Sequence, residues 1–157
     1  MAVVALVVAA VVIVRAEFLN TVTVSSDSMS PTLCTGDVLL VARRGGGSSV
    51  EDGDIVTFTS PQDGAQTIKR VVGTAGQTVT IKDAELFVDG IAVNEPYVDH
   101  ASIDGVFTPL YTVPDGSVFV MGDHRETSID SRVYGPISTD LIDGTLLWKL
   151  WSKCETR

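Results

Sequence analysis

Short runs of apolar and β-branched residues, each closed by a turn signal, recur along the chain from residue 20 onward. Residues 20–24 alternate polar and apolar side chains, which is typical of a strand. Gly36-Asp37 and Ser60-Pro61 then mark turns, and Asp89-Gly90 interrupts an apolar run in the way that favours a tight hairpin. Many short strands separated by turns predict a mostly β fold built from antiparallel sheets.

The predicted strands account for most of the chain after its N-terminal segment. The strand at residues 38–42 is apolar on both faces and is expected to be buried, whereas residues 94–112 are expected to be irregular. The length of 157 residues is compatible with one folded domain, assigned here to residues 20–157. The strands are predicted at residues 20–24, 38–42, 55–59, 67–72, 77–82, 86–93 (a hairpin), 117–121 and 146–151.

The first 14 residues are wholly apolar, and Arg15 and Glu17 end the run. As a helix the run would span roughly 21 Å, whereas a bilayer core is about 30 Å thick. A cleaved signal peptide would begin with basic residues, and a core helix would show a polar face. We interpret residues 1–19 as a membrane anchor that extends through Phe18 and Leu19 or lacks its start. Arg15 then lies on the outer side, against the usual positive-inside bias, which a preceding basic stretch would resolve.

Charge and cysteine content narrow the classes of partner. The formal net charge of −9 disfavours nucleic acid as a partner, because acidic surfaces repel phosphate backbones. The two cysteines, Cys34 and Cys154, have neither C-x-x-C nor metal-site spacing. A disulfide between them and two free thiols are both compatible with the sequence. Cys34 also lies near Ser28 and is an alternative nucleophile, although no catalytic motif surrounds it.

The stretch from Ser26 to Leu33, Ser-Asp-Ser-Met-Ser-Pro-Thr-Leu, is the first candidate for chemistry. Pro31 fixes its own φ and restricts Ser30, so Ser28 is expected in a short, stiff, non-helical segment. A serine is a weak nucleophile and needs a neighbouring base.

This stretch, followed by Gly36-Asp37, resembles the nucleophile box of type I signal peptidases. Three further stretches resemble that family's boxes in the right order, namely residues 53–56, 68–73 and 122–132. The resemblance implies a membrane-tethered serine endopeptidase on the extracytoplasmic side of the cell membrane. Such an enzyme removes N-terminal signal peptides from exported preproteins, without a cofactor or metal. The family prefers small residues at the first and third positions before the cut.

The resemblance also assigns roles to single residues. Lys69 matches the general base, although its place in a strand alone favours an ordinary surface lysine. If Lys69 points inward, burial lowers the pKa of its amine and the neutral form can take the proton of Ser28. Ser26 matches a side-chain donor of the oxyanion hole, and a turn serine bonded to its own backbone is the alternative. The supporting residues matched by the resemblance are Ser128 (orienting the lysine), the pair Asp130 and Arg132, and Asp123 with Arg70.

Several features depart from the family pattern or admit other readings. His124 stands where the family commonly has Asn, and a Ser-His-Asp triad through His124 or His100 would leave Lys69 unexplained. Arg125 and Glu126 are expected to be solvated charges of a loop. Residues 73–77 alter a turn, and the short interval between Lys69 and Ser128 indicates a minimal form without a large inserted subdomain. The rival functions are a self-cleaving repressor-type Ser-Lys peptidase and a non-catalytic tethered β domain that binds exported chains.

Overall fold

A computed structural model describes residues 2–4, 18–43, 49–98 and 108–154 of the protein. Its strands form two sheets, a seven-stranded sheet in the order β1-β2-β11-β3-β4-β9-β10 and a four-stranded sheet in the order β7-β6-β5-β8. All of the strand pairs are antiparallel, as predicted. The strands are β1 (Leu19–Thr23), β2 (Val38–Arg43), β3 (Ile55–Thr59), β4 (Gln66–Thr74), β5 (Thr78–Lys82), β6 (Glu85–Val88), β7 (Ile91–Ala92), β8 (Tyr111–Thr112), β9 (Ser117–Met121), β10 (Ile137–Ser138) and β11 (Ile142–Trp151).

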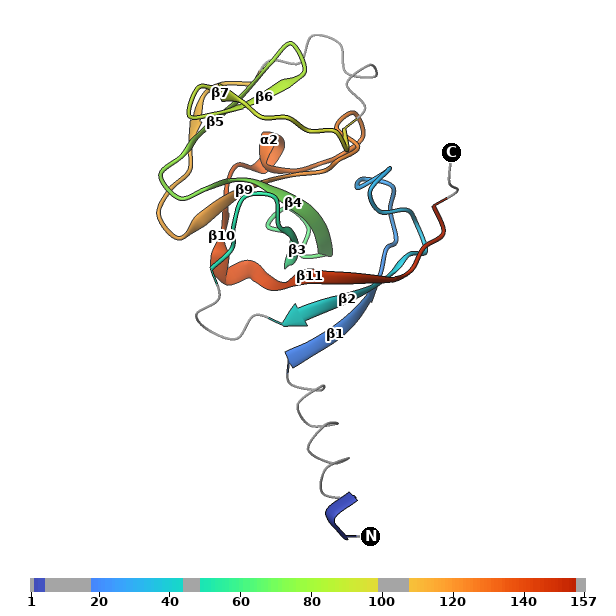
Figure 1. The fold of residues 1–157 in the computed structure, drawn as a ribbon. Helices are drawn as coiled ribbons and strands as arrows, with labels where there is room; N and C mark the ends of the chain where they lie inside the picture. Colours follow the sequence, from blue (N-terminus) through green and yellow to red (C-terminus); the bar gives the residue numbers. More distant parts are fainter. Residues whose placement is uncertain (1, 5–17, 44–48, 99–107, 155–157) are drawn as a thin grey trace.

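The last strand is longer than the sequence predicts and joins the two halves of the large sheet. β11 starts at Ile142 rather than residue 146 and pairs with both β2 and β3. Gly144 permits this pairing, because a Cβ there would collide with the backbone of Ala42. Figure 1 shows β11 beside β2, with β1 at the edge of the sheet and the small sheet at the far end of the molecule.

Two local predictions need correction and one is confirmed. The small strand β8 and its pairing with β5 lie within a region expected to be irregular. β2 was expected to be buried on both faces, but only Leu39 and Val41 are buried, while the alternate side chains stay half-exposed. The β6–β7 hairpin turns at Asp89-Gly90 as predicted, and both residues have positive φ, as a type I′ turn requires.

Three large apolar clusters fill the described part of the fold, and a small fourth one contains Ala84 and Val98. One lies under the segment that contains Ser28 and includes Val24, Met29, Leu33 and Ile68. A second lies between β3, β4 and β9, and a third joins the large sheet to the small one. β4, which carries Lys69 and Arg70, and β9 therefore both contribute buried side chains to these clusters.

Most of the predicted N-terminal anchor falls outside the described residues. Residues 2–4 are helical, and β1 begins at Leu19. Within the described ranges no helix has both the length and the apolar character needed to cross a bilayer.

Candidate active site

Ser28 lies in a compact turn between β1 and β2. The residue is 8% exposed, and Met29 and Leu33 anchor the turn in the apolar cluster below. Within the turn the Leu33 N–H donates to the Met29 carbonyl at 2.8 Å, and the Ser30–Pro31 peptide bond is cis. The short, non-helical segment predicted around Ser28 is thus present, and we call residues 27–34 the nucleophile turn after the role predicted for Ser28.

Lys69 reaches Ser28 from the middle of β4. Its Nζ lies 2.6 Å from Ser28 Oγ, and the lysine is only 4% exposed. Burial lowers the pKa of the Lys69 amine and nearby Arg132 lowers it further, although the carboxylates of Asp130 and Asp123 oppose the shift. The expectation of a surface lysine, drawn from strand position alone, is wrong. The two residues are 41 positions apart in sequence, and only the sheet brings them together.

Ser26 also lies at this point, with its Oγ 3.2 Å from Ser28 Oγ. Ser26 and Ser28 both line a groove of about 530 Å³ that runs along β4. The groove walls include the end of β1 with the residues after it, the first half of β4 and part of the loop that follows β9. Three polar side chains, Ser26, Ser28 and Lys69, thus meet at one part of an open groove.

The loop after β9 closes over the other side of this pair. The His124 N–H donates to the Ser28 carbonyl at 3.1 Å, so the loop is bonded directly to the backbone of the nucleophile turn. Gly122 sits beside that carbonyl and the Ser128 side chain, where a Cβ would collide with both. We call residues 122–132 the bracing loop.

Similarity to known proteins agrees with this arrangement. The family model for signal peptidase, peptidase S26, matches residues 1–151. The chain belongs to this family. Signal peptidase I V of Bacillus subtilis is 38% identical over 132 residues, which cover 76% of this chain and 78% of that protein. Signal peptidase IB of Staphylococcus aureus (strain COL) is 32% identical over 152 residues, covering 85% and 78%. The crystal structure of a signal peptidase I from Enterococcus faecalis V583 matches with a TM-score of 0.57 and 30% identity, over 64% of this chain and 98% of that one.

Membership of the signal peptidase family confirms the function expected from the sequence. The chain is a serine endopeptidase that removes signal peptides, and its substrates are preproteins that carry them. The repressor-type and non-catalytic alternatives are not supported by these comparisons.

In this member of the signal peptidase family, two ion pairs lie where the sequence predicted them. Arg70 donates from Nε and Nη2 to the two oxygens of Asp123 at 2.9 and 2.7 Å, and Asp123 is fully buried. Arg132 makes the equivalent two-point contact with Asp130 at 2.8 and 2.9 Å. Asp130 also accepts from the Gly122 N–H and caps the short helix α2 (Ser131–Tyr134). Both pairs therefore fix the bracing loop.

Ser128 is placed near the site but does not make the predicted contact. Its side chain is 8% exposed, and its Oγ has no hydrogen-bond partner in the described part of the chain. The expected bond that would orient Lys69 is absent from this arrangement. The backbone carbonyl of Ser128 instead accepts from Arg132 Nη2 at 3.2 Å.

A third ion pair was missed in the sequence. Arg125 was expected to be solvated, but it is 4% exposed and its Nη2 lies 2.6 Å from Glu95 Oε1. Tyr97 donates to the same Glu95 oxygen, and the Arg70 guanidinium stacks on the Tyr97 ring at 3.9 Å. Glu95 comes from a segment predicted only to be irregular, and no motif in the sequence marks it as the partner of Arg125.

The structure does not support the alternatives through His124 and Cys34. His124 Nδ1 lies 3.0 Å from Thr127 Oγ1 and 3.7 Å from Asp27, and only its backbone contacts Ser28; His100 lies outside the described residues. Cys34 forms a disulfide with Cys154, so it is not a free nucleophile. Among the described residues those two cysteines with Asp37 are also the sole cluster of metal-ligand type, and the disulfide occupies both sulfurs.

Proposed function

We propose that Ser28 and Lys69 form the catalytic dyad of this signal peptidase. The observation that carries the proposal is the 2.6 Å separation of Lys69 Nζ and Ser28 Oγ in a buried setting that lowers the pKa of the amine. The neutral amine accepts the Ser28 proton as the oxygen attacks the scissile carbonyl, and returns a proton to the leaving amine. A water molecule, activated in the same way, then hydrolyses the acyl-enzyme.

The developing oxyanion would be stabilised by the Ser26 hydroxyl and the Ser28 backbone N–H. Support for this role comes from the place of Ser26 in the groove wall, 3.2 Å from the attacking oxygen. The loss of one such donor costs roughly 2.7–4 kcal/mol of transition-state stabilisation. In this proposal Asp123, Asp130, Arg70 and Arg132 do not touch the substrate. They hold the backbone around the dyad, and Asp130, Arg132 and Asp123 also influence the pKa of Lys69.

The groove is suited to an extended peptide. β1 pairs only with β2 in the described sheet, and β9 pairs with β4 only from Arg70 onward. Residues 22–26 and 66–69, which both line the groove, therefore offer free strand edges to a substrate backbone. Val24 and Ile68 lie in the same groove walls. We propose that these apolar walls accept small side chains, such as alanine, at the first and third positions before the cut.

The decisive test of the nucleophile replaces one hydroxyl in the turn at a time. Ser28→Ala should abolish cleavage of a purified preprotein in detergent, while the neighbouring Ser30→Ala should retain it. Circular dichroism and thermal unfolding should show that both variants remain folded. Near-wild-type turnover by Ser28→Ala would overturn the dyad.

We further propose that the apolar segment predicted at residues 1–19 tethers the enzyme to the bilayer, with the β domain on the extracytoplasmic side. Leu19 itself belongs to β1, where it pairs with Ala42, so the tether ends before it. The wholly apolar run that begins the chain supports this, together with the position of β1 directly after it. Tethering raises the effective concentration of membrane-bound substrates. Deletion of residues 1–14 should preserve hydrolysis of a soluble peptide and weaken processing of a preprotein in proteoliposomes. An equal loss in both assays would show that the segment belongs to the fold instead.

A further inference from the structure

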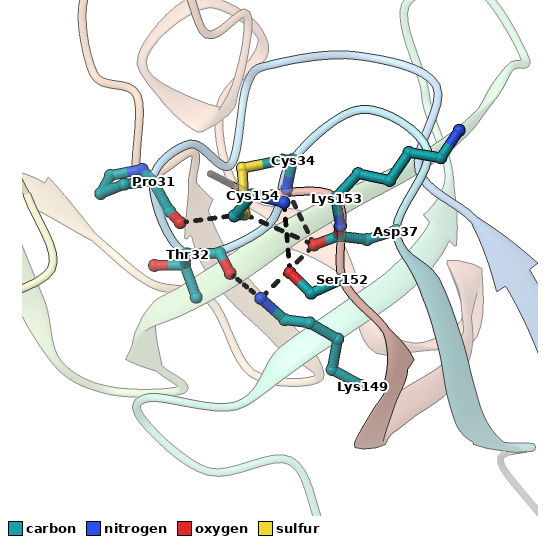
Figure 2. The surroundings of a disulfide bond; sticks show 8 residues. All are labelled: Pro31, Thr32, Cys34, Asp37, Lys149, Ser152, Lys153 and Cys154. Atoms are coloured by element: carbon teal, nitrogen blue, oxygen red, sulfur yellow. Dashed lines mark hydrogen bonds and ion pairs between the residues drawn. A yellow bond between two sulfur atoms is a disulfide. The ribbon is translucent and has the colours of Figure 1, made fainter. Parts of the chain in front are cut away.

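A polar cluster beneath the nucleophile turn plays no part in the catalytic steps proposed above. It consists of Cys34, Asp37, Lys149 and Cys154, and we call it the Asp37 cluster (Figure 2). Two of its members lie at the start of the domain and two at its end, after 100 or more intervening residues. The cluster therefore joins the nucleophile turn to the last strand and the residues after it.

Asp37 is the centre of the cluster and is fully buried. One of its oxygens accepts from the Cys34 N–H at 3.0 Å and lies 3.4 Å from Lys149 Nζ, and the other accepts from the Lys153 N–H. Burial raises the pKa of this carboxyl, but the two backbone donors and Lys149 outweigh burial and keep the pKa below its usual value. The carboxylate is therefore a fixed anion to which both ends of the domain are bonded.

Lys149 connects this anion to the turn itself. Its Nζ donates to the Thr32 carbonyl at 2.7 Å while facing Asp37. Thr32 follows Pro31 in the nucleophile turn, four residues after Ser28. The Lys149 ammonium thus holds the distal part of the turn against β11.

The disulfide fixes the same part of the turn covalently. Cys34 ends the turn, and Cys154 Sγ lies 3.6 Å from the Pro31 carbonyl oxygen (Figure 2). A disulfide sulfur carries no proton, so this approach is a packing contact and the restraint comes from the bond itself. Both cysteines are half-exposed, so a small dithiol can reach them.

The opposite side of the turn is held mainly by apolar contacts of Met29 and Leu33. Such contacts keep the turn on the core, but they are not directional. Attack by Ser28 requires placement to within a fraction of an ångström, and a misplacement of ~1 Å can cost ~100-fold in rate. Directional restraint on the turn comes from the bracing loop on one side and the Asp37 cluster on the other.

We propose that the disulfide and Lys149 position the nucleophile turn, so that the enzyme reaches its full catalytic rate only after Cys34 and Cys154 are oxidised. The inference rests on the proposed role of Ser28. The Cys34–Cys154 bond can be reduced and reformed by thiol–disulfide exchange. A dithiol breaks the S–S bond, leaves two thiols on the protein and itself becomes a cyclic disulfide. An oxidised disulfide reagent reforms the protein disulfide and is itself reduced to thiols. A thiol-oxidising reaction must therefore precede full activity of the newly made chain.

The first experiment compares oxidised and reduced full-length enzyme in detergent. After treatment with dithiothreitol, and with two free thiols verified by titration, kcat on a fluorogenic signal-sequence peptide should fall by about 5- to 20-fold, while KM changes less than about twofold. Reoxidation with glutathione disulfide should restore the rate. A Cys34→Ser/Cys154→Ser variant should show the reduced rate and no response to either reagent. Unchanged kcat with both thiols free would overturn the proposal.

The second experiment keeps the disulfide and removes the ammonium. Lys149→Gln should lower kcat several-fold at a temperature where circular dichroism shows it fully folded, and Lys149→Arg should restore most of the rate. Lys82→Gln, on the small sheet, is the matched control and should behave as wild type. A wild-type kcat for Lys149→Gln would refute the positioning role of Lys149. Failure of the dyad proposal would be seen separately, as activity in Ser28→Ala.

Discussion

The two residues of the proposed dyad are 2.6 Å apart, yet the backbone around each is held by different forces. The nucleophile turn rests on apolar side chains and is fastened at its far end by a disulfide and a half-exposed lysine. The strand that carries Lys69 and the bracing loop beside it are held by three arginine–carboxylate pairs whose carboxylates are fully buried.

This difference indicates how each side responds to its surroundings. A disulfide depends on the redox state of the compartment, and a half-exposed ion pair is weakened by salt. Buried ion pairs respond little to redox state or to salt. Removing one partner costs several kcal/mol of stability, because the other charge is left uncompensated. The nucleophile side is therefore adjustable by solution conditions, whereas the base side is fixed once the chain has folded.

The largest expected effect is on the base itself. Lys69→Arg should lower kcat/KM by about 10²–10⁴-fold, because a guanidinium is not deprotonated in proteins and cannot act as the base. Peptide hydrolysis measures the loss, and Lys82→Arg serves as the control. Substantial activity in the Lys69→Arg enzyme would contradict the role of Lys69.

The next effect distinguishes buried pairs from the disulfide. Glu95→Gln should lower the free energy of unfolding by about 3–5 kcal/mol, since it leaves Arg125 buried without its counter-ion. Urea denaturation under oxidising and reducing conditions should give the same loss. A Glu95→Leu/Arg125→Met double variant should recover part of it. If the single variant is as stable as wild type, the pair does not brace the loop.

The pH dependence of activity tests the state of the base. The neutral Lys69 amine is the active form, and burial lowers its pKa from the ordinary value of 10.5. On the acid side of the pH profile, kcat/KM should therefore rise about tenfold per pH unit and level off below pH 10.5. His124→Asn should leave the midpoint of this rise in place. A midpoint that moves with the histidine would identify His124, and not Lys69, as the titrating group.

The smallest effect concerns acid stability of the nucleophile side. The pKa of Asp37 is lower in the folded protein than in the unfolded chain, so its contribution to stability is present above about pH 4 and is lost as the pH falls through the folded value. Thermal unfolding from pH 6 to pH 2 should therefore show a decline that is shallower in Asp37→Asn. Parallel profiles for the two proteins would mean that Asp37 does not contribute to the decline.

Much of the site could be predicted from four short stretches that resemble the boxes of type I signal peptidases. Ser28, Lys69, Ser26 and the ion pairs Asp123–Arg70 and Asp130–Arg132 were all expected in or near the site. The structure brings these residues together. The bond expected between Ser128 and Lys69 is not formed, and the Glu95–Arg125 pair was not foreseen. The first miss concerns which side chain meets which, and the second brings in a segment around Glu95 that the sequence did not associate with the site.

The sequence alone determined most of the strands, their turns and the order of the motifs, because alternation of side chains and the φ preferences of Gly, Pro and Asp act over a few residues. It did not predict the short strands β8 and β10 or the first half of β11. Tertiary structure decided that Lys69 is buried, that β11 joins two halves of a sheet and that Cys34 pairs with Cys154 across 120 residues. It also decided that Arg125 is an internal ion-pair partner and not a solvated charge. Burial and pairing of this kind depend on residues far away in the chain. The residues next to Lys69, Cys34 or Arg125 in the sequence therefore do not by themselves predict how buried these side chains are or which partners they have.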